Sequence, residues 1–198
     1  MLERSGASLR MTETRTEVYH ASKTPLETGT VLEARFIKAQ HKYQFDVVEA
    51  ALNEPEYPLI LKTLLLSDIS QNRGKAYLTF ALKETVLERI RRREFPDRPS
   101  RYKSIFACPT KADAARFREL IRQGDDRPHL HACSLVGDFF AGDLNYVARA
   151  DPFAPIKKQI DYMIERARLY WQGQKSDRPV IECLAEPGAV TVTSLVPW

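Results

Sequence analysis

The sequence predicts a domain of the α+β class with a mainly antiparallel sheet. Three observations support this class: helical patterns gather in the first part of the chain, strand-like runs concentrate later, and few strand–helix–strand alternations occur. A chain of 198 residues can bury a sizeable core as one unit. We expect residues 1–15 to form a loosely ordered tail and residues 16–198 to form a single domain.

Apolar side chains recur at spacings of three and four residues in several segments, which is the period of a helix packed on a core. Together with one densely apolar run, at 57–66, they predict helices over 42–53, 57–66, 81–93, 110–122 and 151–171. Pro55 and Pro58 separate the first two, and Pro96 and Pro99 end the third. Thr110 is a good N-cap for the fourth.

Most of the remaining apolar runs predict strands. They cover residues 17–20, 101–108, 129–136, 144–149, 180–185 and 189–196. The last two flank Glu186-Pro187-Gly188, a short turn signal, so we expect them to form a hairpin. Asp138 and Asp143 each follow a glycine and are expected to be turn residues.

Basic charge is concentrated in one segment. The whole chain carries a formal charge of +4, which is too small to indicate nucleic-acid binding by itself. From Arg89 to Lys103, seven basic residues stand against two acidic ones, a net +5. Phe95 and Tyr102 lie among these cations, so one alternative is a non-catalytic nucleic-acid-binding protein whose affinity falls steeply with salt.

The cysteines and the apolar runs exclude several classes of protein. Cys108, Cys133 and Cys183 lie far apart, and an odd number without a CxxC pair argues against a disulfide framework or a zinc ribbon. No run approaches the roughly 20 apolar residues of a membrane span, and the N-terminus lacks the apolar region of a Sec signal. We therefore expect no membrane partner, and a protein that is cytoplasmic or is delivered into a target cell without a Sec signal.

Three side chains alternate along one predicted strand and therefore share a face: His129, His131 and Cys133. This geometry permits metal ligation, but no fourth ligand is evident. We expect a plain strand face and no metal.

Three segments, in this order, carry a resemblance to a known family. The first is Tyr19-His20-Ala21-Ser22-Lys23, followed by Leu26 and Gly29. The second is Ser104-Ile105-Phe106-Ala107, followed by residues 112–117. The third is Ala167-x-x-Tyr170-Trp171-x-Gly173, followed by Val180-Ile181-Glu182. They resemble the opening strand, the middle strand and helix, and the closing helix and glutamate-bearing strand of small ADP-ribosyltransferases of the rifampin ADP-ribosyltransferase kind.

The resemblance implies an ADP-ribosyltransferase-like fold, with two small antiparallel sheets around a cleft and flanking helices. It also implies transfer of ADP-ribose from NAD to a macromolecule or small molecule, with release of nicotinamide. By analogy, such a small chain suits a bacterial toxin, effector or modifying enzyme. Catalytic roles fall to Glu182, which would stabilise the cationic transition state, and to His20, which would bind a ribose hydroxyl. The NAD-binding set is His20, Tyr19, Ser22, Arg101, Tyr102, Ser104 and Phe106, with Tyr102 or Phe106 stacking on nicotinamide and Arg101 at the pyrophosphate.

The chemistry explains why these residue types suffice. Breaking the nicotinamide–ribose bond builds positive charge on the sugar, and a fixed carboxylate stabilises that charge as it develops. An aromatic face suits the flat cationic leaving group. The chain departs from the family pattern, because it has no Ser-Thr-Ser strand and Val180 stands where a Glu or Gln two residues before Glu182 is expected. The acceptor class is therefore left open.

Each candidate also has an ordinary structural interpretation. His20 can be a hydrogen-bonded residue at a strand end, and Glu182 can face solvent, since alternation points it away from Ile181 and Cys183. Phe106 can belong to the core. If these interpretations hold, the chain is a degenerate family member that serves as a protein-interaction module.

Overall fold

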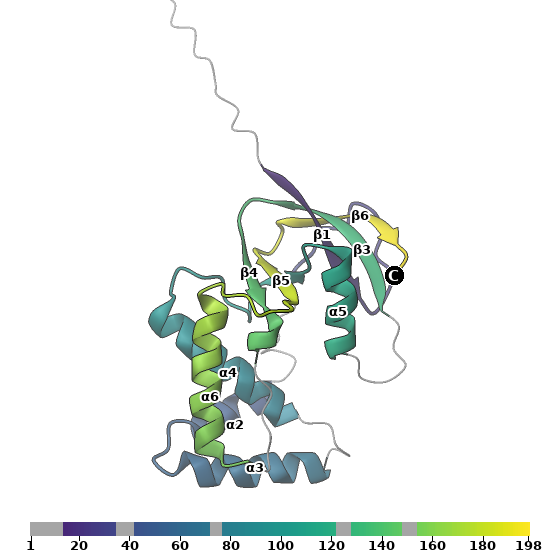
Figure 1. Ribbon diagram of the computed structural model, residues 1–198. Coiled ribbons are helices and arrows are strands. Elements are labelled where there is room, and N and C mark those ends of the chain that lie inside the picture. The colour runs from purple at the N-terminus through teal and green to yellow at the C-terminus, as the bar shows by residue number, and fades with distance from the viewer. Residues whose placement is uncertain (1–13, 35–41, 72–76, 122–127, 148–153) are drawn as a thin grey trace, which may run out of the picture.

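Two three-stranded antiparallel sheets occupy one end of the molecule, and four of its helices occupy the other (Figure 1). The computed structural model describes residues 14–34, 42–71, 77–121, 128–147 and 154–198. Mixed α+β architecture with antiparallel sheets is therefore confirmed. The predicted tail lies outside the described residues as far as position 13, and Arg15 already belongs to the first strand.

The first sheet has the order β1-β3-β6 and is antiparallel throughout. Its strands are β1 (Arg15–Ser22), β3 (His129–Val136) and β6 (Val190–Val196). In the register of β1 and β3, His20 lies opposite His131. The central strand β3 has its predicted bounds. As its alternating pattern predicts, apolar side chains of this strand are buried on the side that faces the second sheet.

The second sheet has the order β2-β5-β4 and is also antiparallel. Its strands are β2 (Ile105–Ala107), β5 (Ile181–Ala185) and β4 (Phe139–Asp143). The sheets are joined at Tyr19 and Cys108, whose backbones exchange N–H···O bonds of 2.8 and 2.7 Å. This bridge brings the end of β1 directly beside β2.

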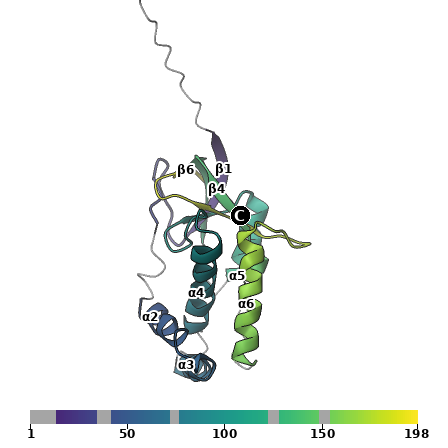
Figure 2. The same ribbon diagram turned by 90° about the vertical axis from the view of Figure 1, so that its left-hand side faces the viewer.

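Helices α2 (Lys42–Ala51), α3 (Tyr57–Gln71), α4 (Tyr77–Glu94) and α6 (Ile156–Trp171) pack on a common apolar core. Helices α4 and α6 run side by side, and α3 crosses beneath them (Figure 2). The Trp171 indole ties α6 to α4 by donating to the carbonyl of Leu87 at 2.9 Å. Within the described residues, no helix combines the length and the apolar character that crossing a membrane requires.

Helix α5 (Lys111–Ile121) stands apart from the other helices and packs on β1 through a small apolar cluster around Ala114, Cys108 and Leu130. Its predicted N-cap is confirmed. The Thr110 hydroxyl accepts the N–H of Asp113 at 3.0 Å and donates to the Asp113 carboxylate at 2.6 Å.

The predicted hairpin between the last two strands is wrong. Strands β5 and β6 follow one another around Gly188, but β5 pairs with β2 and β4 whereas β6 pairs with β3. Gly188 has a φ of +85°, so the chain turns sharply there as a hairpin would. A turn of this kind fixes the change of direction, while burial of both strands in different sheets fixes their partners.

The predicted strand at 144–149 is also displaced. The structure has β4 at Phe139–Asp143 and a short 3-10 helix, η1, at Leu144–Tyr146, while residues 148 and 149 lie outside the described residues. Asp143 stops the strand because its carboxylate accepts the N–H groups of Asn145, Ser176 and Val180. It is therefore a buried cap, in contrast to the plain turn residue that its glycine neighbour predicts.

Candidate functional site

Two cavities meet at the end of β1. The first cavity has a volume of about 590 Å³ and the second cavity about 490 Å³, both within the roughly 300–1,000 Å³ typical of small-molecule sites. His20, Ala21 and Phe106 line both of them. The bridge between β1 and β2 places these three residues at the junction.

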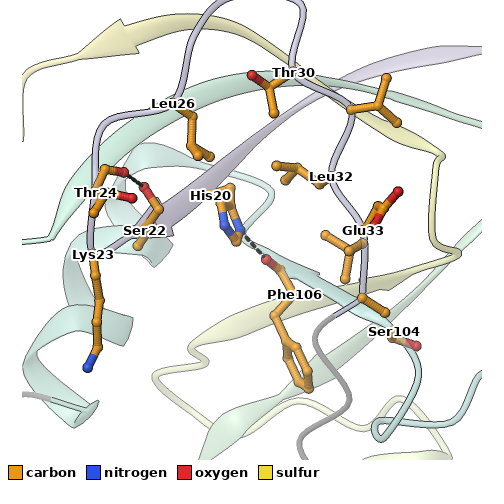
Figure 3. A pocket seen from close by; sticks show the side chains of 14 residues that line it. His20, Ser22, Lys23, Thr24, Leu26, Thr30, Leu32, Glu33, Ser104 and Phe106 are labelled. Atoms are coloured by element: carbon orange, nitrogen blue, oxygen red, sulfur yellow. Dashed lines mark hydrogen bonds between the residues drawn. The ribbon is translucent and has the colours of Figure 1, made fainter.

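His20 stands in the middle of the first cavity, and a loop carrying Thr30, Leu32 and Glu33 forms the facing wall (Figure 3). Its Nδ1 lies 2.8 Å from the carbonyl oxygen of Phe106. A carbonyl can only accept, so Nδ1 carries the proton. In the neutral ring, Nε2 is then the acceptor nitrogen, which suits a hydroxyl donor.

Ser22 and His131 are hydrogen-bonded to each other at the turn that follows β1. The Ser22 hydroxyl donates to the carbonyl of Thr24 at 2.5 Å, so His131 Nε2 donates in turn to Ser22 at 3.0 Å. Burial lowers the pKa of His131, and the positive charges that His20 and His129 can carry lower it further. His131 therefore stays neutral and holds the turn after β1.

Glu182 lines the second cavity from the central strand of its sheet. Only 1% of the residue is exposed, so the solvent-facing interpretation is wrong. Helix α6 covers the face of β5 that carries Glu182. The Tyr170 hydroxyl of this helix donates to Glu182 Oε1 at 2.6 Å, and Arg101 Nη1 donates to the same oxygen. The other oxygen, Oε2, is buried and has no hydrogen-bond partner among the described residues.

Arg101 lies between two buried carboxylates. Glu84 of α4 accepts from Arg101 Nε at 2.8 Å and from Nη2 at 3.2 Å, while Glu182 accepts from Nη1. Burial acts to raise the pKa of Glu84, but the charges of Arg101 and Lys83 outweigh it and the pKa is lowered. Burial opposes the charge of Arg101 as well, yet Glu84 and Tyr170 leave its pKa raised. Both groups are therefore charged at neutral pH.

Tyr170 reaches Glu182 because the strand opposite has no side chain in the way. Gly142 of β4 pairs with Glu182, and a Cβ at Gly142 would overlap the Tyr170 ring. Burial raises the pKa of Tyr170, and the positive charge of Arg101 only partly offsets this shift. The phenol therefore stays protonated and serves as a donor to Glu182.

The structure brings most of the predicted site residues to the two cavities. Ser22 and Ser104 line the first, and Tyr19, Arg101 and Glu182 line the second. Their three hydroxyl groups are already engaged. The Tyr19 hydroxyl donates to Glu17, the Ser104 hydroxyl to the carbonyl of Ser100, and the Ser22 hydroxyl to the carbonyl of Thr24.

Tyr102 is the predicted residue that lies in neither cavity. Residues 101–103 form a turn before β2, so the predicted strand begins only at Ile105. The Tyr102 ring is buried in the helical core, with its centroid 5.1 Å from that of Phe45. Of the two aromatic residues that the sequence offered for stacking, only Phe106 therefore lines the cavities.

Arg101 does not suit the pyrophosphate role assigned to it. Its guanidinium is buried and makes four hydrogen bonds, to Glu84, Tyr170 and Glu182. Sequence reasoning missed Glu84, and gave Tyr170 no role in the site. The available signal was that Glu84 and Glu88 stand one helical turn apart in the predicted helix over 81–93.

The basic segment is organised for internal pairing. Arg91 donates to Glu88 and to two backbone carbonyls, and Arg92 also donates to Glu88. Arg93 pairs with Glu94, and Arg89 with Glu49. These contacts weaken the nucleic-acid interpretation, because phosphate binding needs cations that are available to the ligand.

The part of the chain that the structure describes contains no group of three His, Cys, Asp or Glu placed to hold an ion, and the face shared by His129, His131 and Cys133 is no exception. Both His131 and Cys133, on β3, are fully buried.

The fold and the paired cavities define a mixed α+β protein with a ligand-sized site where its two antiparallel sheets meet. The family model described as protein of unknown function DUF2441 matches residues 13–196, and the chain belongs to this family. A search of the curated proteins finds no match.

Proposed function

We propose that the chain binds NAD across the two cavities and transfers its ADP-ribose to an acceptor, releasing nicotinamide. One observation supports this most: Glu182 is buried in the same cavity that His20 and Phe106 line, and its Oε2 lacks a hydrogen-bond partner among the described residues. A buried carboxylate oxygen without a partner is costly unless a ligand group completes it. The resemblance of the three sequence segments to small ADP-ribosyltransferases identifies the ligand.

The residues favour one orientation of NAD. The nicotinamide and its ribose fit the second cavity, beside Glu182 and the aromatic ring of Phe106. The pyrophosphate and adenosine fit the first cavity, where Lys23 is the lining cation and Thr24 and Thr30 supply hydroxyl groups. His20 stands at the junction, where its Nε2 accepts a ribose hydroxyl.

Glu182 acts on the charge of the transition state. As the bond between the ribose C1′ and the ring nitrogen breaks, its electron pair leaves with nicotinamide and positive charge grows on the sugar. The carboxylate stabilises this charge more strongly than it stabilises the ground state. An acceptor oxygen or nitrogen then bonds to C1′ and loses its proton to solvent. Tyr170 and Arg101 fix Oε1 so that Oε2 faces the ligand.

The test is nicotinamide release by the purified full chain, together with NAD binding by calorimetry. Glu182→Gln should lower the release rate by roughly 100-fold or more, on the scale of one preorganised charge-stabilising group, while NAD affinity changes only a few-fold. Glu186→Gln, at the exposed turn after β5, is the matched control and should change neither quantity. If the wild-type chain neither binds NAD nor releases nicotinamide with any candidate acceptor, the proposal is wrong.

A further inference from the structure

We infer that Glu84 allows the second cavity to accept a positively charged ring, and therefore oxidised NAD, because it offsets the positive charge of the lining. This inference rests on the proposed function. The nicotinamide ring carries a positive charge in oxidised NAD and none in NADH, while the rest of the two molecules is the same. Discrimination by charge must come from charged side chains near the ring.

The charged side chains that line the second cavity balance one another. Lys83 and Arg101 are positive, and Glu84 and Glu182 are negative. The carboxylate that would attract a cation, Glu182, is paired with Arg101, so by itself this pair presents no net charge. Glu84 also pairs with Arg101, so that two carboxylates face the single positive charge of this arginine.

Without Glu84, the lining would carry a net positive charge, from Lys83 and Arg101 against Glu182 alone. The other titratable groups in the lining add no negative charge at neutral pH. Hydrogen bonding to Glu17 raises the pKa of Tyr19, burial raises the pKa of Cys108 to about 12, and His20 is neutral or positive. A cationic ring would then be repelled by the lining, whereas the present lining has no net charge.

The surroundings make one charge matter. Phe80, Phe106 and Phe117 line the cavity, and Glu84 is almost fully buried. Charges among apolar side chains are screened less than charges in water, so their interaction with a ring a few ångströms away is stronger. Lys83 is more exposed, with a quarter of its side chain accessible, and its effect is therefore weaker.

Glu88 provides a matched control on the same helix. It lies one turn after Glu84, is similarly buried, and also binds an arginine through both carboxylate oxygens. It does not line the second cavity. A change that only disturbs a buried ion pair of α4 should be reproduced by Glu88→Gln, whereas a change in ligand charge preference should not.

The experiment measures the affinity of the full chain for two pairs of probes by calorimetry. One pair is oxidised NAD and NADH, and the other is the 1-methylnicotinamide cation and neutral nicotinamide. Because the four lining charges cancel in the wild type, we expect the cationic member to bind at least as tightly as the neutral member. Glu84→Gln should weaken binding of the cationic member on the order of tenfold, and binding of the neutral member by less than about threefold. Glu88→Gln should leave both ratios unchanged.

Lys83→Gln gives a second measurement with the opposite sign, at a partly exposed position where a substitution changes stability less than at buried Glu84. It should raise the cation preference about threefold. The inference is overturned if Glu84→Gln weakens both members of a pair equally, if Glu88→Gln shifts the ratio as much, or if Lys83→Gln fails to raise it. A wild-type chain that binds none of the four probes overturns the proposed function itself.

Discussion

Two networks of buried charge lie one helical turn apart on α4, and they differ in what surrounds them. The cavity network consists of Glu84, Arg101, Tyr170 and Glu182, contributed by α4, the turn before β2, α6 and β5. The helix-end network consists of Glu88, Arg91, Arg92 and Ser100, all from α4 and the segment that follows it.

The two networks differ in how far apart their residues lie in the sequence and in whether these residues line a cavity. The helix-end network is local, has an exposed arginine in Arg92, and closes the C-terminal end of α4, where cations also suit the helix dipole. The cavity network joins residues up to 98 positions apart, between Glu84 and Glu182. One oxygen of Glu182, a residue that lines the second cavity, is buried and has no hydrogen-bond partner among the described residues. The same residue types therefore stabilise a helix end in one place and line a ligand-sized cavity in the other.

Replacing Arg101, the central cation of the cavity network, should give the largest difference in stability between the two networks. Arg101→Met leaves Glu84 and Glu182 buried without their shared partner, and should lower the free energy of unfolding by about 3–5 kcal/mol. Arg91→Met should cost about 1 kcal/mol, because Glu88 keeps Arg92 and Ser100. Urea unfolding measures both. Equal losses would show that the two networks are energetically equivalent.

The space beside Tyr170 belongs to the cavity network alone. Gly142→Ala places a Cβ against the Tyr170 ring and should destabilise the fold by about 1–3 kcal/mol as the ring is displaced from Glu182. Ala141→Ser, at the exposed neighbouring position, should cost less than about 0.5 kcal/mol. Thermal denaturation compares the two, and an unaffected Gly142→Ala variant would contradict the close contact described here.

Acid should weaken the cavity network through Glu84. Its pKa in the folded chain is held below the ordinary value of 4.5, although burial alone would raise it, because Arg101 and Lys83 stabilise the charged form. The stabilisation is therefore complete above pH 4.5 and is lost as the pH falls below that value. Unfolding free energies measured from about pH 6 to pH 3 should fall less steeply in Glu84→Gln than in the wild type. An unchanged slope would contradict the shift.

The smallest effect is expected at the exposed edge of the helix-end network. Arg92→Ala removes a cation whose side chain is 59% exposed, and should change the free energy of unfolding by less than about 1 kcal/mol. Retention on RNA or DNA columns should also be unchanged, since the cluster pairs internally. A large loss of salt-sensitive retention would revive the nucleic-acid interpretation.

Sequence reasoning recovered the elements with strong periodicity. Strand β3 and helix α6 follow from regular apolar spacing, and the Thr110 cap follows from a local motif. The pairing of β5 and β6 could not be derived, because a turn and two apolar runs look alike whether the strands join each other or separate sheets. Of the predicted site residues, His20, Phe106 and Glu182 line the second cavity, whereas Glu84, which also lines it, was hidden within a helical pattern.

By itself, the amino-acid sequence determined where most helices and strands form, because backbone preference and the period of apolar side chains act over a few neighbouring residues. Only the tertiary structure decided which strands pair, that Tyr102 belongs to the helical core, and that Arg101 lies between two carboxylates distant in sequence. These outcomes depend on which surfaces bury each other and on which charges lose water together. Both are properties of the assembled chain and of no single segment.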